Sequence, residues 1–307
     1  MRNDLDHLPA DRQAELQHIV RILFEEFEDT IARTTDPKRK KGRILKVILY
    51  GSFARGDWVD DPVGGYKSDY DILVVVNDER LTDFEYWALA EDRLMRDATI
   101  THRLSAPVGF VVHSLTDVDA QLHKGRPFFT DIVAQGVALY EAIGHPLSRP
   151  GELQIGDRLA EARHNFDEWY PSTIKFKRAA DFLVEDGGPR EAAFNYHQAA
   201  ERAYHCALLV FTLYSPKSHK LNFLRGQAED LAPTLVNAWP RVNRFDRRCF
   251  ELLRLAYVNA RYSSEYAISA TELAWIGERI GILQNLVRDV CEQRLAELKA
   301  ATSKAAE

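Results

Sequence analysis

The chain has 307 residues, 46% of them hydrophobic and 28% charged, and its formal net charge is −6 at pH 7. This length and apolar content predict two domains with substantial cores. The acidic balance excludes a dedicated, strongly basic nucleic-acid binder, and no apolar run approaches the roughly 20 residues that cross a bilayer. The acidic N-terminus lacks the features of a signal peptide, so we expect a cytoplasmic protein with no membrane partner.

The N-terminal half alternates helical and extended patterns. Apolar residues at helical spacing run through residues 8–34, and a basic, glycine-containing loop is expected at 35–43. Further helices are expected at 82–98, 117–124 and 127–139, and strands at 44–50, 70–76, 108–113 and 139–140. The boundary signal Arg149-Pro150-Gly151 ends this mixture, so we assign residues 1–148 to an N-terminal domain with a mixed sheet.

The most informative segment follows the first expected strand. Gly51 and Ser52 turn the chain, and the next three residues can open a helix. Backbone N–H groups at such a turn suit a polyphosphate, and the Ser52 hydroxyl can donate one more hydrogen bond. Asp69 and Asp71 are two residues apart on the next strand, so we expect both carboxylates on one face. Their mutual repulsion is tolerable if Mg²⁺ lies between them.

This arrangement resembles the nucleotidyltransferase superfamily that includes DNA polymerase beta and kanamycin nucleotidyltransferase. The resemblance covers roughly residues 40–145, with the stretch Asp57–Lys67 as an insertion. It implies a nucleoside triphosphate substrate and Mg²⁺ held by two catalytic carboxylates, Asp69 and Asp71. The nucleotide-binding residues that it implies are Gly51, Ser52, Arg55, Lys67 and Ser68.

Active members of that superfamily supply a third carboxylate from a later strand. In the strand expected at 108–113, Gly109, or else Val108, stands where that carboxylate belongs. His113 ends this strand, Asp117 and Asp119 follow it, and one of the three could approach the site. Two carboxylates still suffice to bind a Mg²⁺-nucleotide, with catalysis then slow or absent.

The C-terminal half has helical patterning throughout. Helices are expected at 155–184, 190–214, 219–231, 241–266 and 271–300. Five helices joined by short loops indicate an all-α bundle, which we assign to residues 149–307. The whole chain is therefore predicted to be α+β, with a mixed sheet followed by a helical bundle.

The order of motifs in this bundle is similar to the HEPN domain, over roughly residues 155–300. The motifs are the segment 194–203, His219-Lys220-Leu221, Ala256-Tyr257 and Ala260-Arg261-Tyr262. Many HEPN domains are ribonucleases in which an Arg is followed, after four to six residues, by a catalytic His. No His follows Arg261 in that window, so we expect no such activity. Arg261 remains a candidate phosphate or RNA contact, and His197 and His205 are expected to pack within the bundle or at an interface.

Several functions stay open at this stage. The first is a Mg²⁺-dependent enzyme that transfers a nucleoside monophosphate to a hydroxyl of an RNA or protein acceptor. In related toxin–antitoxin systems, nucleotidyltransferases use ATP to adenylylate a tyrosine of a HEPN toxin, so Tyr262 and Tyr266 are modification candidates here. The second is a nucleotide-binding sensor whose helical half engages RNA or protein, and the third is an aminoglycoside-type nucleotidyltransferase.

A homodimer through the helical half is also expected. Residues 190–214 and 241–266 carry apolar or aromatic residues on more than one face. A small bundle has difficulty burying all of them, and a remaining apolar patch is typical of an interface. The resemblance to HEPN domains implies dimerisation as well.

Overall fold

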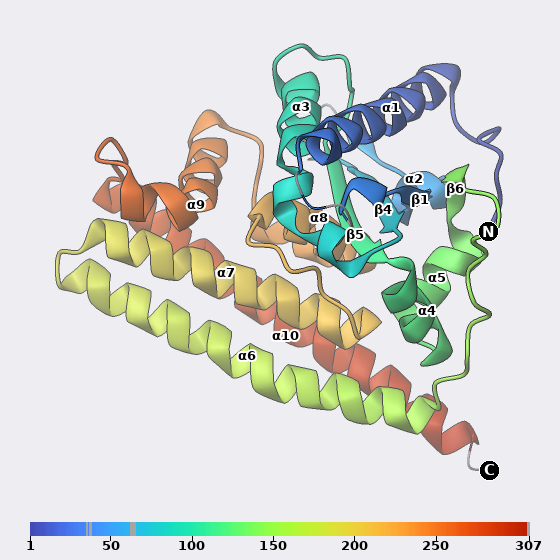
Figure 1. Ribbon diagram of the computed structural model, residues 1–307. Coiled ribbons are helices and arrows are strands. Elements are labelled where there is room, and N and C mark those ends of the chain that lie inside the picture. The colour runs from blue at the N-terminus through green and yellow to red at the C-terminus, as the bar shows by residue number, and fades with distance from the viewer. Residues whose placement is uncertain (35, 37–38, 62–65, 306–307) are drawn as a thin grey trace. The chain divides into compact units, whose positions relative to one another are not determined.

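The structure is a computed structural model that describes residues 1–34, 36, 39–61 and 66–305. The chain forms two compact units, the first comprising residues 1–60 and 67–152 and the second containing residues 153–307 (Figure 1). A mixed sheet lies in the first unit and helices make up the second, which confirms the predicted α+β fold. The expected loop at 35–43 and the insertion at 57–67 lie partly outside the described residues.

The sheet of the first unit has the strand order β5-β4-β1-β6. Strand β4 is parallel to β5 and antiparallel to β1, which is also antiparallel to β6. Every residue of β1 and β4 is buried, so helices must cover both faces of the central pair. The bounds are Ile44–Tyr50 for β1, Tyr70–Val76 for β4, Val108–Ser114 for β5 and Val137–Glu141 for β6. A separate two-stranded ribbon pairs β2 (Asp60–Asp61) with β3 (Tyr66–Lys67).

Helices α1 (Ala10–Arg33) and α3 (Ala88–Thr99) pack together on one face of this sheet, while α4 (Leu115–His123) and α5 (Pro127–Gln135) lie on the other (Figure 1). The α1 face contains alternate strand residues, among them Val47, Leu49, Ile72 and Val74. The intervening residues of each strand point to the other face because side chains alternate along a strand.

The segment before α3 differs from the expected helix at 82–98. It forms two short 3₁₀ turns, η2 (Glu79–Thr82) and η3 (Phe84–Tyr86), and α3 begins only at Ala88. The Asp78 carboxylate accepts a hydrogen bond from the Arg80 amide and so caps the first turn. The buried Trp87 indole then donates to the Leu81 carbonyl at 2.7 Å, which fixes the tight path of the chain.

In the described part of the chain, the second unit has five α-helices, as predicted. Their bounds are Ile155–Glu185 for α6, Pro189–Thr212 for α7, Leu221–Leu231 for α8, Arg244–Tyr262 for α9 and Ala270–Ala305 for α10. A 3₁₀ turn, η4 (Pro233–Ala238), follows α8. Helix α7 contacts all four other helices, and its buried alanines permit their close approach. No helix in the described part of the chain combines the length and the apolar composition that crossing a membrane requires.

The contact between α7 and α10 yields a test of this packing. A Cβ atom on Gly277 would lie 2.5 Å from the Tyr196 Oη atom. Tyr196 is buried and its hydroxyl donates to Asp181 at 2.8 Å, so the ring has little room to move. We expect Gly277→Ala to lower the free energy of unfolding by about 1–3 kcal/mol through overpacking.

Gly281→Ala on the same helix is the matched control for this substitution. Its Cβ would meet only the Lys177 Cε atom, at 3.6 Å, so this change should leave stability unchanged or raise it by up to about 1 kcal/mol. Urea unfolding of both full-length variants is the measurement. Equal midpoints for the two would contradict the close contact between α7 and α10.

Candidate active site

The turn that follows β1 has the conformation that the sequence predicted. Helix α2 (Gly51–Arg55) begins directly after Tyr50, and Gly51 has a φ of 71°, in the left-handed region that favours glycine. The carbonyl of Ser52 accepts hydrogen bonds from the amides of Gly56 at 2.9 Å and Asp57 at 3.2 Å. These two hydrogen bonds from the residues that follow α2 therefore fix the backbone at Ser52.

The N-terminal segment also holds α2 in place. The His7 ring forms a hydrogen bond with the Phe53 carbonyl at 2.9 Å, and the Arg2 guanidinium donates to the Ala54 carbonyl. Arg2 itself is attached to the sheet through a bridge to Val137 at the start of β6. These contacts satisfy carbonyls at the C-terminal end of a helix too short to satisfy them itself.

The register of β1 on β4 places this turn beside the two candidate carboxylates. Tyr50, the last residue of β1, lies opposite Asp71. Because the strands are antiparallel, the residues that follow Tyr50 lie beside those that precede Asp71, including Asp69. Strand β4 begins at Tyr70, so Asp69 lies just before the strand rather than on it. Asp71 is only 4% exposed, and Asp69 is half-buried.

The neighbouring strand supplies no carboxylate at this level. Gly109 of β5 lies opposite Asp71, and Val108 lies opposite Tyr70. His113 is paired with Val75, four residues farther along, which corresponds to about 13 Å. The candidates that follow this strand are engaged elsewhere: Asp117 contacts His113 at 2.6 Å, and Asp119 accepts from the Ser148 amide at 2.8 Å. Among the described residues, no group of three or more His, Cys, Asp or Glu side chains is arranged to hold a metal ion.

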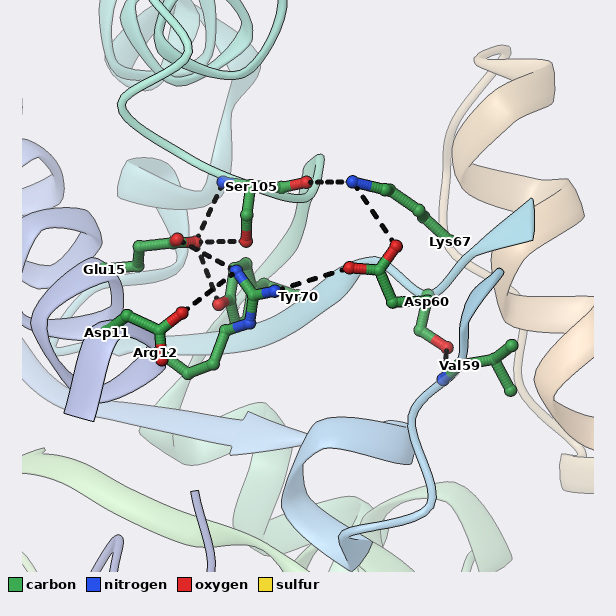
Figure 2. Close-up of polar contacts among 9 residues, drawn as sticks. Asp11, Arg12, Glu15, Val59, Asp60, Lys67, Tyr70 and Ser105 are labelled. Carbon is green, nitrogen blue, oxygen red and sulfur yellow. Dashed lines mark hydrogen bonds and ion pairs between the residues drawn. The ribbon is translucent and has the colours of Figure 1, made fainter. Parts of the chain in front are cut away.

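The candidate nucleotide-binding cations lie at the edge of this site. The Arg55 guanidinium contacts Asp57 at 3.1 Å. The Lys67 ammonium contacts Asp60 at 3.4 Å and donates to the Ser105 carbonyl at 3.3 Å (Figure 2). Both side chains are at least one-third exposed, so a bound anion can reach them.

Ser68 is buried and forms two hydrogen bonds with Val59, which lies across the ribbon from it. Its amide donates to the Val59 carbonyl at 2.9 Å, and its hydroxyl oxygen accepts from the Val59 amide at 3.0 Å. The hydroxyl therefore fixes the chain immediately before Asp69. Its contact with a nucleotide stays a prediction.

Sequence reasoning missed two residues that support the carboxylates. Tyr70 is fully buried between Asp69 and Asp71, and its hydroxyl donates to the Glu15 carboxylate on α1 at 2.9 Å (Figure 2). Burial and the nearby Glu15 carboxylate raise the pKa of Tyr70, so the phenol stays protonated. The local sequence carries no signal for this pair, because the two residues are 55 positions apart.

In the second unit, Arg261 lies near the end of α9 among aromatic rings. Its guanidinium carbon is 4.6 Å from the Tyr257 ring centroid and 5.0 Å from those of Phe194 and Tyr262. The two candidate tyrosines differ sharply in exposure. Tyr262 is 76% exposed, whereas Tyr266 is 7% exposed and donates its hydroxyl to the Leu252 carbonyl at 2.9 Å.

Three histidines gather around the buried carboxylate of Glu201 on α7. His219 contacts it at 3.1 Å, His197 at 3.4 Å and His205 at 4.0 Å. Burial alone would raise the pKa of Glu201, but its polar contacts with His197 and His219 outweigh this effect and lower it. The i, i+4 spacing of residues 197, 201 and 205 signals part of this cluster, and His219 joins it from the loop before α8.

The histidine cluster adjoins Arg261 through one aromatic ring. His219 stacks on Tyr257 with ring centroids 4.5 Å apart, and Arg261 packs on the same residue. The sequence predicted that His197 and His205 pack within the bundle or at an interface, and both are buried within the bundle.

The sheet, the Gly-Ser turn and the adjacent aspartates together have the arrangement that the resemblance to nucleotidyltransferases implied. Residues 166–288 match the HEPN domain family. The N-terminal part is similar to a protein of Methanocaldococcus jannaschii that carries the provisional name of a protein adenylyltransferase. The two are 28% identical over 102 residues, which are 33% of this chain and 82% of the archaeal protein. The N-terminal part is thus similar to a protein named as an adenylyltransferase and the C-terminal part matches the HEPN domain family, in the order that the motifs predicted.

Burial of His205 makes the stability of the helical unit depend on pH. Burial lowers the pKa of His205, so at pH values below about 6.5 the unfolded chain binds this proton more readily than the folded chain. Stability should therefore fall as the pH drops from 7 to 5.5. Glu201, whose pKa is lowered from 4.5, loses its contribution only in more acidic solution.

The variant His205→Gln should show a shallower loss of stability between pH 7 and 5.5 than the wild type. His164→Gln is the control, because the His164 side chain is 75% exposed. Urea unfolding at several pH values measures the slope independently of any overall loss of stability. A slope equal to that of the wild type in both variants would show that His205 does not titrate on unfolding.

Proposed function

We propose that this protein is a Mg²⁺-dependent nucleotidyltransferase that transfers a nucleoside monophosphate from a nucleoside triphosphate to a hydroxyl. The observation that carries the proposal is the register of β1 on β4, which brings the Gly51-Ser52 turn beside Asp71. The name of the archaeal relative favours ATP as the substrate and a protein as the acceptor.

The donor atoms at this site suit Mg²⁺. This ion prefers oxygen ligands and is usually held by one or two carboxylates together with substrate phosphates. Asp69 and Asp71 would supply the carboxylates, and their separation by one strand residue makes a shared ion favourable for both. Bound there, the ion would neutralise charge on the triphosphate.

The chain's own groups would then orient the nucleotide. Amides of the Gly51-Ser52 turn would donate to phosphate oxygens, and Arg55 and Lys67 would offset the charge of the departing pyrophosphate. The acceptor oxygen forms a bond to the α-phosphorus while the bond to the bridging oxygen breaks. Pyrophosphate leaves with that electron pair, and the acceptor proton passes to water.

A tyrosine of a HEPN domain is the acceptor that we favour, in this chain or in a second copy. Of the two candidates, Tyr262 has the exposure that modification requires, and Arg261 packs against its ring, where it could attract an incoming phosphate. Such a transfer would fit a role related to toxin–antitoxin systems. Mass spectrometry of the chain incubated with ATP and Mg²⁺ would detect an added nucleoside monophosphate on Tyr262.

Asp69→Asn and Asp71→Asn test the proposed site. We expect each change to weaken Mg²⁺-dependent ATP binding by about tenfold or more, equivalent to about 1.4 kcal/mol, because each removes a charged metal ligand. Isothermal titration calorimetry measures the affinity, and a pyrophosphate assay measures turnover. Asp92→Asn is the control, since Asp92 is an exposed aspartate on α3 that pairs with Arg96. Affinities equal to the wild type in both site variants would refute the proposed site.

A nucleotide-binding sensor is the second candidate function. Gly109, the strand residue opposite Asp71, favours this candidate. It has no carboxylate that could complete the metal site or remove the proton from the attacking hydroxyl. The same two assays separate the candidates. An enzyme releases pyrophosphate in the presence of an acceptor, whereas a sensor binds Mg²⁺-ATP without turnover.

The oligomer that we propose is a homodimer through the helical unit. Tyr196 and Tyr204, two aromatic residues of the segment 190–214 that motivated this expectation, are in fact buried within the bundle, so they cannot form the interface. Val258 on α9 remains exposed and supports a contact there. Light scattering of the full chain should give about twice the 35.1 kDa mass of one chain.

Val258→Glu should shift that mass toward the monomer, because it places a charge in an apolar contact. Met95→Glu on α3 is the matched control, since Met95 is also exposed but lies in the first unit. A wild-type mass of one chain at micromolar concentrations would exclude the dimer.

A further inference from the structure

The residue between the two candidate carboxylates is held at three points. Tyr70 is fully buried, on the face of the sheet opposite to Asp71. Its amide donates to the Pro107 carbonyl at 2.8 Å, and its hydroxyl donates to Glu15 at 2.9 Å (Figure 2). Its ring stacks on Phe53, with the ring centroids 4.2 Å apart.

The ring contact links the two halves of the candidate active site. Phe53 directly follows Ser52, so its ring is attached to the turn that would bind phosphate. Phe53 also stacks on Trp58, whose ring is nearly parallel to it with the ring centroids 5.5 Å apart. A shift of Tyr70 would therefore displace both the carboxylates on either side of it and the Gly51-Ser52 turn.

Glu15 on α1 is the common acceptor of the surrounding hydrogen bonds. Its Oε2 atom accepts from the Tyr70 hydroxyl, from the Ser105 amide at 3.0 Å and from the Ser105 hydroxyl at 2.8 Å. Its Oε1 atom accepts from Arg12 at 3.0 Å (Figure 2). A largely buried carboxylate with donors on both oxygens is stabilised in one position.

A second set of contacts leads from Glu15 to the candidate cation. Arg12 reaches Asp60 at 3.4 Å, and Asp60 contacts the Lys67 ammonium at 3.4 Å. Lys67 also donates to the carbonyl of Ser105, whose amide and hydroxyl are bonded to Glu15. Figure 2 shows these side chains converging from α1, from the ribbon and from the loop before β5.

From these contacts we infer that Tyr70 and Glu15 are positioning residues of the nucleotidyl-transfer site. They set the carboxylates, the phosphate-binding turn and Lys67 relative to one another without touching the substrate. This inference rests on the proposed function. Phosphoryl-type transfer depends mostly on positioning and charge, so a small displacement of these groups costs rate rather than binding.

Tyr70→Phe is the sharpest test, because it keeps the ring on Phe53 and removes only the hydroxyl. We expect kcat to fall on the order of ten- to hundredfold while KM and the ATP affinity change by less than about threefold. Glu15→Gln replaces one accepting oxygen with an NH₂ group that faces the surrounding donors. We expect it to lower kcat further than Tyr70→Phe does, again with little change in KM. Glu25→Gln on the same helix, where Glu25 pairs with Arg93, is the control and should match the wild type.

Hydrogen–deuterium exchange gives a readout that does not depend on activity. In Tyr70→Phe, amides of residues 51–55 and 67–72 should exchange faster than in the wild type, while those of α10 should not change. Unchanged exchange in both segments, or a fall in kcat that only follows a lower melting temperature, would overturn the positioning role. A wild-type chain that neither binds Mg²⁺-ATP nor turns over would instead refute the proposed function, and the exchange result would still decide whether Tyr70 orders the site.

Discussion

The antiparallel register of β1 on β4 is the constraint on which the candidate site depends. It places Tyr50 opposite Asp71, so the Gly51-Ser52 turn and the aspartates meet at one end of the strand pair. A shift of one residue would exchange the two faces of β4 and point Asp71 into the apolar layer under α1. The burial of Ile72 and Val74 against α1 opposes such a shift. The packing that stabilises the sheet therefore also keeps the Asp71 carboxylate on the face opposite to α1.

Local sequence patterns predicted most of the elements and singled out the two candidate carboxylates, because each depends on neighbouring residues. The strand at 44–50 ends directly before Gly51, which has a positive φ, so its end was predicted to the residue. The contacts that hold the site could not be predicted in this way. Glu15 meets Tyr70 across 55 positions, and the start of α3 at Ala88 depends on the buried indole of Trp87.

In the helical unit, too, the sequence predicted only some of the contacts among the buried polar residues. A buried carboxylate such as Glu201 requires polar partners, because its charge would otherwise be lost or destabilising. Two of its three histidines come from the same helix, at a spacing visible in the sequence. The third, His219, comes from a loop, and only the fold shows that it stacks on the ring against which Arg261 packs. Motif spacing along the chain therefore did not reveal that the histidine cluster adjoins the Tyr257 ring on which Arg261 packs.

The glycine opposite Asp71 bears on the choice of acceptor. With no carboxylate at Gly109, the strand offers no general base to remove the proton of the attacking hydroxyl. The proposed reaction would then depend more heavily on how readily the acceptor loses that proton by itself. A tyrosine phenol, with a pKa of about 10, loses its proton far more readily than the aliphatic hydroxyl of serine or a sugar. In the proposed reaction, a site with two aspartates and a glycine would thus suit a phenol better than an aliphatic alcohol.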